Sequence, residues 1–407
     1  MCGCSTTYSG FSYSPITQTA DSKLRGTYQQ DLPNKQIHKR TSGRNTFFSR
    51  DSILEQSSLA LESALSDLDS NRGKELRAAH EVYRKEIITL SDKVIKNWGN
   101  DEVELTSQDS IIKYSDHYLS RSKINFSDGK IRVETVDKSN PEQSLQNAII
   151  STLLTPDDPR SIDLYSDSAV KFGGKPFLSG LIKDNEGKEV LYEWRAKKYA
   201  QYLVQNKLKT RKDSKGDEVY YVDLQMEGNY AELAGNNYQA FVKKYAKKYN
   251  LQPALLMAII RTESNFNPYA MSYVPAFGLM QVVPSTAGAD SHELITGQKG
   301  APTKQMLFTP ETNIHYGSAY LHILYTRYLK DIKNPQSQEY CVIAAYNTGS
   351  GNVLRVFHND RTKAIKVINS LSPKQVYKKL ASKLQKAEAR EYVQKVSGFK
   401  QQYKGMI

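Results

Sequence analysis

The sequence predicts an α+β protein, with a mixed α+β domain first and a mainly α-helical domain after it. Its 407 residues are enough for two or three domains. Alternating apolar residues, the signal of β-strands, gather between about residues 102 and 226. From residue 237 onward the apolar residues recur at helical spacing instead. These patterns divide the chain into residues 1–50, 51–98, 99–230 and 231–407.

Residues 1–50 are predicted to be a flexible tether, because polar residues dominate them and apolar residues do not cluster. Cys4 follows Gly3 and precedes Ser-Thr-Thr, which is how a lipid-anchored bacterial lipoprotein begins once its signal peptide is removed. Only three residues precede Cys4, so the charged and apolar parts of a signal peptide are missing from this sequence. The alternative is that Cys2 and Cys4 are incidental. Together with Cys341 they form neither a disulfide framework nor a metal-ligand set.

Residues 51–98 are predicted to be helical, with a break near Asn71-Arg72-Gly73. Two apolar stripes mark the segment: one is formed by Leu54, Leu61, Leu65 and Leu68, the other by Tyr83, Ile87, Leu90, Val94 and Trp98. We expect these stripes to pack on each other or on the next domain.

Residues 99–230 are predicted to form a compact α+β domain that positions or binds a ligand, because they contain no catalytic constellation. Asp128-Gly129, with alternating residues on both sides, predicts a β-hairpin. The other expected elements are a helix from Asn140-Pro141 to Leu154, a β segment within 176–191, a helix over 193–208 and a strand over 219–226. Asp157 and Asp158 are expected to shape a turn rather than bind a metal.

Residues 231–407 are predicted to be helical throughout. The apolar periodicity favours helices over 238–249, from Pro253 to the region of Glu263, from Asn313 onward, and over 337–346, 363–371, 373–384 and 386–403. Cys341 is expected to be a small core residue of one of these helices.

Glu263 is the candidate general acid of the chain. Ala254 to Ile260 are apolar without interruption, so their helix should be buried, and Ile260, Ile259, Leu256 and Leu255 share a face with Glu263. Desolvation on such a face raises the pKa of a carboxyl group and keeps it protonated, as general-acid catalysis requires. The alternative is a carboxylate in water or paired with Arg261.

A polar turn and a second apolar segment follow Glu263 and can form the wall of a cleft. Gly278 permits a tight backbone there, and Gln281 adds an amide that donates and accepts hydrogen bonds. Further along, Tyr346 stands at the edge of a sharp turn, after which Asn352 is expected to cap the next helix. We expect Glu263 to be buried beside Tyr346 and Gln281 in an open groove.

The formal charge of +13 and the pI of about 9.3 favour an anionic partner: nucleic acid, anionic lipid or a carboxylate-bearing polymer. Nucleic acid is the weakest of these, because the sequence has no zinc-finger spacing and no RNA-binding signature. No stretch approaches the length that crosses a membrane. No metal site and no cofactor is expected.

Four motifs occur together, in order, across about 90 residues: ESNFNP, GLMQ, NI-x2-G-x2-YL and AYN-x-G-x-G-x-V. This combination resembles the catalytic domain of the soluble-type lytic transglycosylases, which share the goose-type lysozyme fold. The preceding domain, with HYLSRSKINFSDGKI and DDPRSIDLYSD, resembles the N-terminal domain of membrane-bound lytic murein transglycosylase C. The resemblance covers roughly residues 95–400 and leaves the helical segment before it without a family account.

The resemblance implies non-hydrolytic cleavage of the β-1,4 bond from N-acetylmuramic acid to N-acetylglucosamine in peptidoglycan. Glu263 would protonate the glycosidic oxygen and then, once ionised, take the proton of the muramic acid 6-hydroxyl. The N-acetyl group of the substrate, rather than a second carboxylate, would stabilise the cation. The products would carry 1,6-anhydromuramic acid ends.

The resemblance also implies roles for the neighbours of Glu263. Ser264 would support the turn and Met280 would line the wall. Ser272 and Gln281 would contact sugar. Tyr346 would face the catalytic acid with its hydroxyl, Asn347 would shape that corner, and Asn313 would be structural. Pro275-Ala276-Phe277 departs from the small residues that relatives carry there, which changes the adjoining subsite.

Two other functions are compatible with the same residues. A hydrolytic muramidase on this fold would use water and a second acid, such as Asp290 or Glu311. An inactive peptidoglycan-binding lipoprotein would need none of the retained site residues. In the first reading, the expected partners are peptidoglycan glycan strands and, through a lipid on Cys4, the outer membrane, with the protein facing the periplasm.

Overall fold

The first folded part is built on a five-stranded antiparallel sheet. The structure, a computed structural model, describes residues 49–65 and 70–405. The strand order is β1-β2-β3-β5-β4, with β1 at Ser110–Ser115, β2 at Ser120–Asn125, β3 at Lys130–Thr135, β4 at Lys209–Lys212 and β5 at Glu218–Gln225. β2 and β3 pair across Asp128-Gly129, which confirms the predicted hairpin. β5 confirms the strand expected over 219–226.

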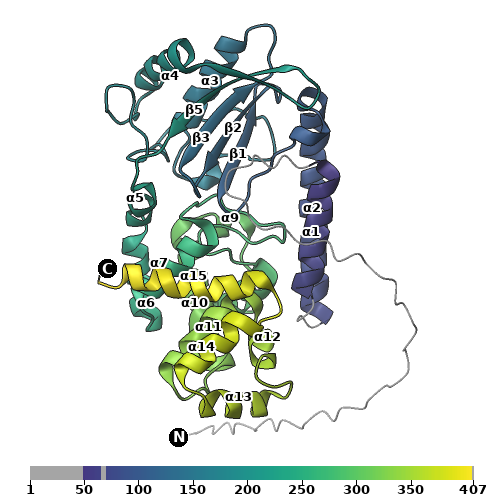
Figure 1. Ribbon diagram of the computed structural model, residues 1–407, viewed down its shortest axis with the longest axis vertical. Coiled ribbons are helices and arrows are strands. Elements are labelled where there is room, and N and C mark those ends of the chain that lie inside the picture. The colour runs from purple at the N-terminus through teal and green to yellow at the C-terminus, as the bar shows by residue number, and fades with distance from the viewer. Residues whose placement is uncertain (1–48, 66–69, 406–407) are drawn as a thin grey trace, which may run out of the picture. The chain divides into compact units, whose positions relative to one another are not determined.

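Two helices accompany the sheet: α3 (Pro141–Leu153) packs against β2, β3 and α4 (Glu193–Lys207), as Figure 1 shows. The helix at Pro141 is confirmed, although the Asn140 side chain makes no capping hydrogen bond. The β segment expected within 176–191 is wrong. The segment makes isolated bridges instead of a strand: Pro176 pairs with Pro156, and Lys183 pairs with Glu189 around a tight turn in which Asp184 accepts from the Glu186 and Lys188 amides.

The sheet domain contains a buried network of charged side chains from β2, β3 and β4. The Arg121 side chain is 1% exposed and pairs with Glu102 and Glu134, while its guanidinium lies over the Trp98 ring. Arg211 reaches the same two carboxylates. Each buried charge therefore has an opposite partner, which burial requires.

Two long helices, α1 (Arg50–Leu65) and α2 (Ser70–Trp98), precede the sheet and pack on each other. The second expected stripe is buried from Tyr83 to Trp98, and the Trp98 indole donates to the Tyr118 carbonyl at 2.7 Å. Asn71-Arg72-Gly73 lies in the first turn of α2, so the helix break expected there is wrong, and residues 66–69 lie outside the described residues. Short 3₁₀ turns follow at Asn100–Glu102 and Pro159–Ser161.

The rest of the chain is helical, which confirms the predicted α+β class with helices in its second part. Its helices are α5 (Tyr230–Asn236), α6 (Gln239–Tyr249), α7 (Pro253–Ser264), α8 (Ala289–Thr296), α9 (Lys304–Leu307), α10 (Pro310–Ile323), α11 (Pro335–Thr348), α12 (Ser350–Arg355), α13 (Arg361–Ser370), α14 (Pro373–Lys383) and α15 (Ala387–Tyr403), with π-helical turns at Pro284–Gly288 and Leu324–Tyr328.

Two helix starts differ from expectation. α10 begins at Pro310 rather than Asn313, because Pro310 occupies a first-turn position after Thr309. α12 begins at Ser350, directly after Gly349, so Asn352 lies inside the helix instead of capping it. Cys341 is buried in α11, as expected.

α7 is the centre of the helical part. α15 lies across it in Figure 1 and contacts both α7 and α11. The turn after α7 docks on the sheet domain: the Asn265 amide donates to the Phe126 carbonyl, and the Tyr269 hydroxyl donates to the Pro156 carbonyl at 2.5 Å. The end of α7 is therefore held from two directions.

Candidate active site

Glu263 occupies the last turn of α7 and is 8% exposed. Pro253 starts the helix, the run Leu255–Ile260 is buried, and Asn265 ends it in the left-handed conformation. Burial and, to a smaller extent, the charge of Glu388 raise the pKa of Glu263 to about 8, although a hydrogen bond from Tyr392 acts in the opposite direction. Glu263 is thus protonated near neutral pH.

The alternative in which Glu263 pairs with Arg261 is wrong. The Arg261 guanidinium lies over the rings of Phe266 and Phe399, at 6.0 and 5.5 Å from their centroids. The partner of Glu263 is Tyr392 of α15, whose hydroxyl donates to Glu263 Oε1 at 2.7 Å. Sequence reasoning missed Tyr392, since it predicted the helix but found no motif around this residue.

Tyr346, predicted to direct its hydroxyl at the acid, donates instead to the Met280 carbonyl at 2.9 Å. Tyr346 is still a neighbour of the site: burial, and then the charge of Glu263, raises its pKa well above the usual value. The Tyr346 hydroxyl therefore holds the GLMQ segment against the end of α11. The hydrogen bond to the acid that was expected from Tyr346 is made by Tyr392.

The segment that carries GLMQ is fixed to α7 and α10 by buried polar side chains. The Ser264 hydroxyl is within hydrogen-bond distance of the Ile260 and Leu279 carbonyls, at 3.1 and 2.8 Å. The Asn313 amide donates to the carbonyls of Phe277 and Leu307, and its oxygen accepts from the Met280 amide. Asn313 is fully buried, so its role here is structural, as expected.

Gln281 ends this segment in the left-handed conformation, with φ of 47°. Its Nε2 donates to the Ala270 and Gly278 carbonyls, at 3.0 and 2.9 Å. Within the part of the chain that the structure describes, its buried Oε1 has no hydrogen-bond partner. Gln281 is therefore anchored through its amide nitrogen.

The other predicted site residues differ in exposure. The half-buried Ser272 donates its hydroxyl to the Val274 carbonyl, and Asn347 is half-buried in the last turn of α11. Met280, expected to line the wall, has no exposed surface. A Cβ on Gly317 would meet its sulfur at 2.5 Å, so Met280 packs against α10. Cys4 lies outside the described residues.

The two acids suggested for a hydrolytic mechanism are engaged elsewhere. Asp290 is buried, pairs with Arg72 at 2.5 Å and accepts from the Tyr328 hydroxyl at 2.8 Å. Glu311 pairs with Lys244 at 2.6 Å. The carboxylate whose charge acts on Glu263 is Glu388, in the first turn of α15, which sequence reasoning did not consider.

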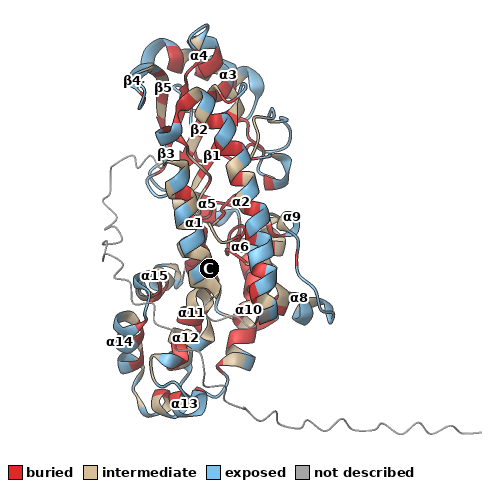
Figure 2. Cartoon of the chain, turned by 90° about the vertical axis from the view of Figure 1, so that its right-hand side faces the viewer, coloured by how far each residue is buried: buried red, intermediate tan, exposed pale blue. Residues whose placement is uncertain are grey.

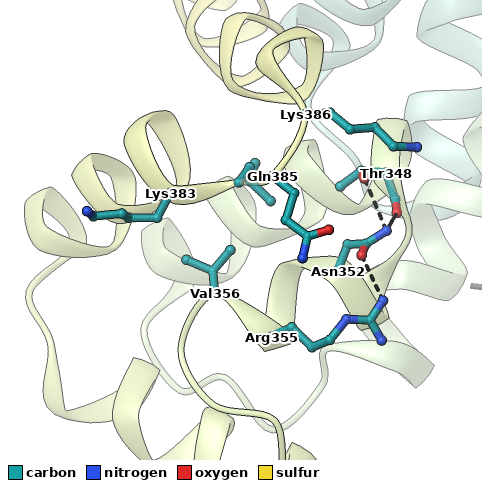
Figure 3. A pocket seen from close by; sticks show the side chains of 8 residues that line it. Thr348, Asn352, Arg355, Val356, Lys383, Gln385 and Lys386 are labelled. Atoms are coloured by element: carbon teal, nitrogen blue, oxygen red, sulfur yellow. Dashed lines mark hydrogen bonds between the residues drawn. The ribbon is translucent and has the colours of Figure 1, made fainter. Parts of the chain in front are cut away.

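Two of the cavities among the described residues border the helical part. One, of about 200 Å³, lies beside the turn after α11 and is lined by polar and basic side chains that include Thr348, Asn352, Arg355, Lys383 and Lys386 (Figure 3). The other, of about 900 Å³, lies between residues 156–173 of the sheet domain and the surface formed by Met271, Lys304 and Phe308.

The site combines three features: the buried acid Glu263 at the end of an apolar helix, the hydrogen bond that Tyr392 donates to it, and a neighbouring loop that Asn313 holds in place. Together they are typical of a lysozyme-like enzyme. Two family models match: "Membrane-bound lytic murein transglycosylase C, N-terminal domain" over residues 76–237 and "Transglycosylase SLT domain" over 240–369. The chain belongs to the membrane-bound lytic murein transglycosylase C family.

Its relatives include proteins of that name from Serratia proteamaculans, 45% identical, and Yersinia pestis, 44% identical, each aligned over 75% of this chain and 86% of the relative. A solved structure, an inactive mutant of the lytic transglycosylase Slt from Pseudomonas aeruginosa, is 29% identical over 40% of this chain and 23% of that one, with a TM-score of 0.30. In residues 49–65 and 70–405, no helix has the length and apolarity to cross a membrane.

Proposed function

We propose that this protein is a peptidoglycan lytic transglycosylase in which Glu263 is the single general acid and base. The bond cleaved is the β-1,4 bond from N-acetylmuramic acid to N-acetylglucosamine. The observation that carries the proposal is the burial of Glu263, which raises its pKa to about 8 while Tyr392 supports its carboxylate form. The names of the relatives, which are lytic murein transglycosylases, support the substrate and the reaction.

In the first half of the reaction, the neutral Glu263 donates its proton to the glycosidic oxygen as the bond from that oxygen to the anomeric carbon breaks. The N-acetyl oxygen of the muramic acid stabilises the cation that forms. In the second half, the Glu263 carboxylate takes the proton of the 6-hydroxyl, and that oxygen bonds to the anomeric carbon. No water is consumed, and Glu263 ends protonated.

Tyr392 has a defined part in this sequence. Its hydroxyl donates to Glu263 Oε1, so it lowers the energy of the carboxylate that exists between the two proton transfers. The same hydrogen bond fixes the orientation of the carboxyl group, which has to reach two different oxygens of the substrate. Tyr392 is therefore proposed as a positioning residue.

We propose a path for the glycan strand, called the strand path below, that runs past Glu263 between two segments. One is the Ser272–Gln281 segment; the other comprises the end of α11 and the start of α15. Along it, the half-buried Ser272 and Asn347, together with Gln281, contact sugar. Ser264, Met280 and Tyr346 hold the Gln281 segment in place: Ser264 and Tyr346 through hydrogen bonds, and Met280 through its buried side chain.

The membrane is the second proposed partner. The relatives are named membrane-bound, and Gly3-Cys4-Ser5 has the form of a lipid-modified lipoprotein start. A lipid on Cys4 would place the enzyme on the outer membrane, facing the periplasm and the peptidoglycan. Mass spectrometry of the protein recovered from membranes tests this: an N-terminal fragment with acyl chains on Cys4 is expected, and an unmodified Cys4 contradicts it.

The test of the reaction is mass spectrometry of sacculi digested by the wild type and by Glu263→Gln. Anhydro products, about 18 Da lighter than hydrolytic muropeptides, are expected from the wild type alone. Full-mass reducing-end products would overturn the transglycosylase in favour of a muramidase. One observation favours a muramidase: a second carboxylate, Glu388, is near enough for its charge to raise the pKa of Glu263. Glu388→Gln should then abolish hydrolysis, whereas a transglycosylase retains activity in that variant.

A further inference from the structure

Helix α1 lies outside both family matches, which begin at residues 76 and 240, yet it touches the catalytic part at two places. We infer that α1 bridges the two sides of the strand path and thereby requires a glycan strand to enter by its end. The inference rests on the proposed function, because it uses the strand path defined there. It concerns where along a strand the enzyme cuts.

The first contact joins α1 to the segment that follows Glu263. Ser57 is fully buried, and its hydroxyl donates to the Tyr273 carbonyl at 3.4 Å. The ring of His80 on α2 lies 2.8 Å from the same hydroxyl and is itself buried. Tyr273 directly follows Ser272, so α1 is fastened to the edge of the Ser272–Gln281 segment.

The second contact joins α1 to the opposite segment. Lys386, just before α15, donates through Nζ to the Ser63 carbonyl of α1 at 3.1 Å. Lys386 lies two residues before Glu388, whose charge acts on Glu263, and six before Tyr392. α1 is therefore fastened to the start of the helix that supplies the partner of the acid.

The two contacts are close together on α1. Six residues separate Ser57 from Ser63, which at the rise of an α-helix is about 9 Å. Over that length the helix runs from one side of the strand path to the other. Figure 2 shows the same arrangement: α1 and α2 stand in front of the helical part, with α15 on one side and α8 and α9 on the other.

α2 keeps α1 in this position. Arg50 of α1 pairs with Asp92 of α2 at 2.5 Å. α2 in turn pairs with the catalytic part through Arg72 and the buried Asp290, and through Glu86 and Lys304 at 3.1 Å. A bridge fixed at both ends prevents a continuous strand from being laid in from the side. A strand that enters by its end meets no such barrier.

The consequence for the reaction is exolytic cleavage. With α1 in place, early products from sacculi should be short anhydro-muropeptides, and the remaining strands should shorten slowly. Releasing α1 opens the strand path from the side, so cuts inside strands should appear and long anhydro-ended oligosaccharides should accumulate.

The test compares early digests of sacculi by the full chain and three variants. Lys386→Ala removes the contact with Ser63, and Ser57→Arg displaces α1 from Tyr273. Lys383→Ala is the matched control, because Lys383 lines the same small cavity as Lys386 but belongs to α14 (Figure 3). The share of internal cuts should rise at least threefold in the first two variants and stay at the wild-type level in the control.

An equal share of internal cuts in the wild type, Lys386→Ala and Lys383→Ala would overturn the inference. Lys386 is exposed, so its variant should keep the fold even if Ser57→Arg does not. A failure of the proposed function is distinguishable, because it would remove anhydro ends from the products of every variant whatever their lengths.

Discussion

The Tyr392 hydroxyl donates a hydrogen bond of 2.7 Å to Glu263 Oε1, across 129 positions of the sequence. Both side chains are buried. Burial raises the pKa of Glu263 to about 8, and this hydrogen bond opposes the rise. The acid is therefore protonated near neutral pH but has a donor ready for the carboxylate that forms when it gives up its proton.

Tyr392→Phe should lower kcat about tenfold, because losing a hydrogen bond to the carboxylate costs on the order of 1–2 kcal/mol. Without it the pKa of Glu263 rises further, so the loss of activity at alkaline pH should move to higher pH. A pH–rate profile measures both effects. Tyr403→Phe, on the same helix, is the control and should match the wild type. An unshifted profile in Tyr392→Phe would remove Tyr392 from the mechanism.

Glu263→Gln should stabilise the protein in a pH-dependent way. The folded-state pKa of about 8 lies above the ordinary value of 4.5. The wild type should therefore be most stable below pH 4.5 and should lose unfolding free energy as the pH rises to 8, where the loss levels off. The total loss should be about 5 kcal/mol at most.

The Tm difference between Glu263→Gln and wild type should grow over that range. Thermal unfolding at pH 4, 6, 8 and 9 measures it. Glu142→Gln, at an exposed position of α3, controls for the loss of one carboxylate and should show a constant difference. A constant difference for Glu263→Gln as well would mean that Glu263 is not desolvated.

Gly278→Ala should destabilise the protein by about 3 kcal/mol or more and reduce activity. Gly278 has φ of 72°, and a Cβ there would lie 2.5 Å from both Asn313 Nδ2 and the Leu307 carbonyl oxygen. Gly297→Ala is the matched control, since Gly297 has φ of 73° with open space around it. It should cost only about 1 kcal/mol. Denaturant unfolding measures both losses. Equal losses would show that position 278 requires glycine only because of its positive φ, and not because of the close contact with Asn313.

Arg121→Met should destabilise the protein by about 3–5 kcal/mol, because it leaves two buried carboxylates short of a cation. Burial alone would raise the pKa of Glu134, but Arg121 and Arg211 lower it to about 2. The stability that this pairing contributes is present above pH 4.5 and lost as pH falls toward 2.

The difference in unfolding free energy between Arg121→Met and wild type should therefore shrink on acidification. Lys197→Met, which removes an exposed pair with Glu193, should cost less than about 0.5 kcal/mol at any pH. A difference that is independent of pH would argue against the charge network as the cause.

Much of the fold could be predicted because it depends on local patterns. Asp128-Gly129 between alternating residues specifies a hairpin, and Pro253 before an apolar run specifies a buried helix. The burial of Glu263 follows from the same run, since its neighbours on the helix face are fixed by spacing. The 176–191 segment escaped prediction because Asp184 closes a turn through side-chain hydrogen bonds that alternation does not report.

The sequence by itself thus determined the α+β class, the helical second part and the buried acid. Only the tertiary structure decided the partners of that acid. Tyr392 and Glu388 reach Glu263 because α15 packs across α7, and α1 reaches Tyr273 and Lys386 because α2 holds it there. Helical periodicity tells which face of a helix is buried; which other helix covers that face depends on how all the faces fit together.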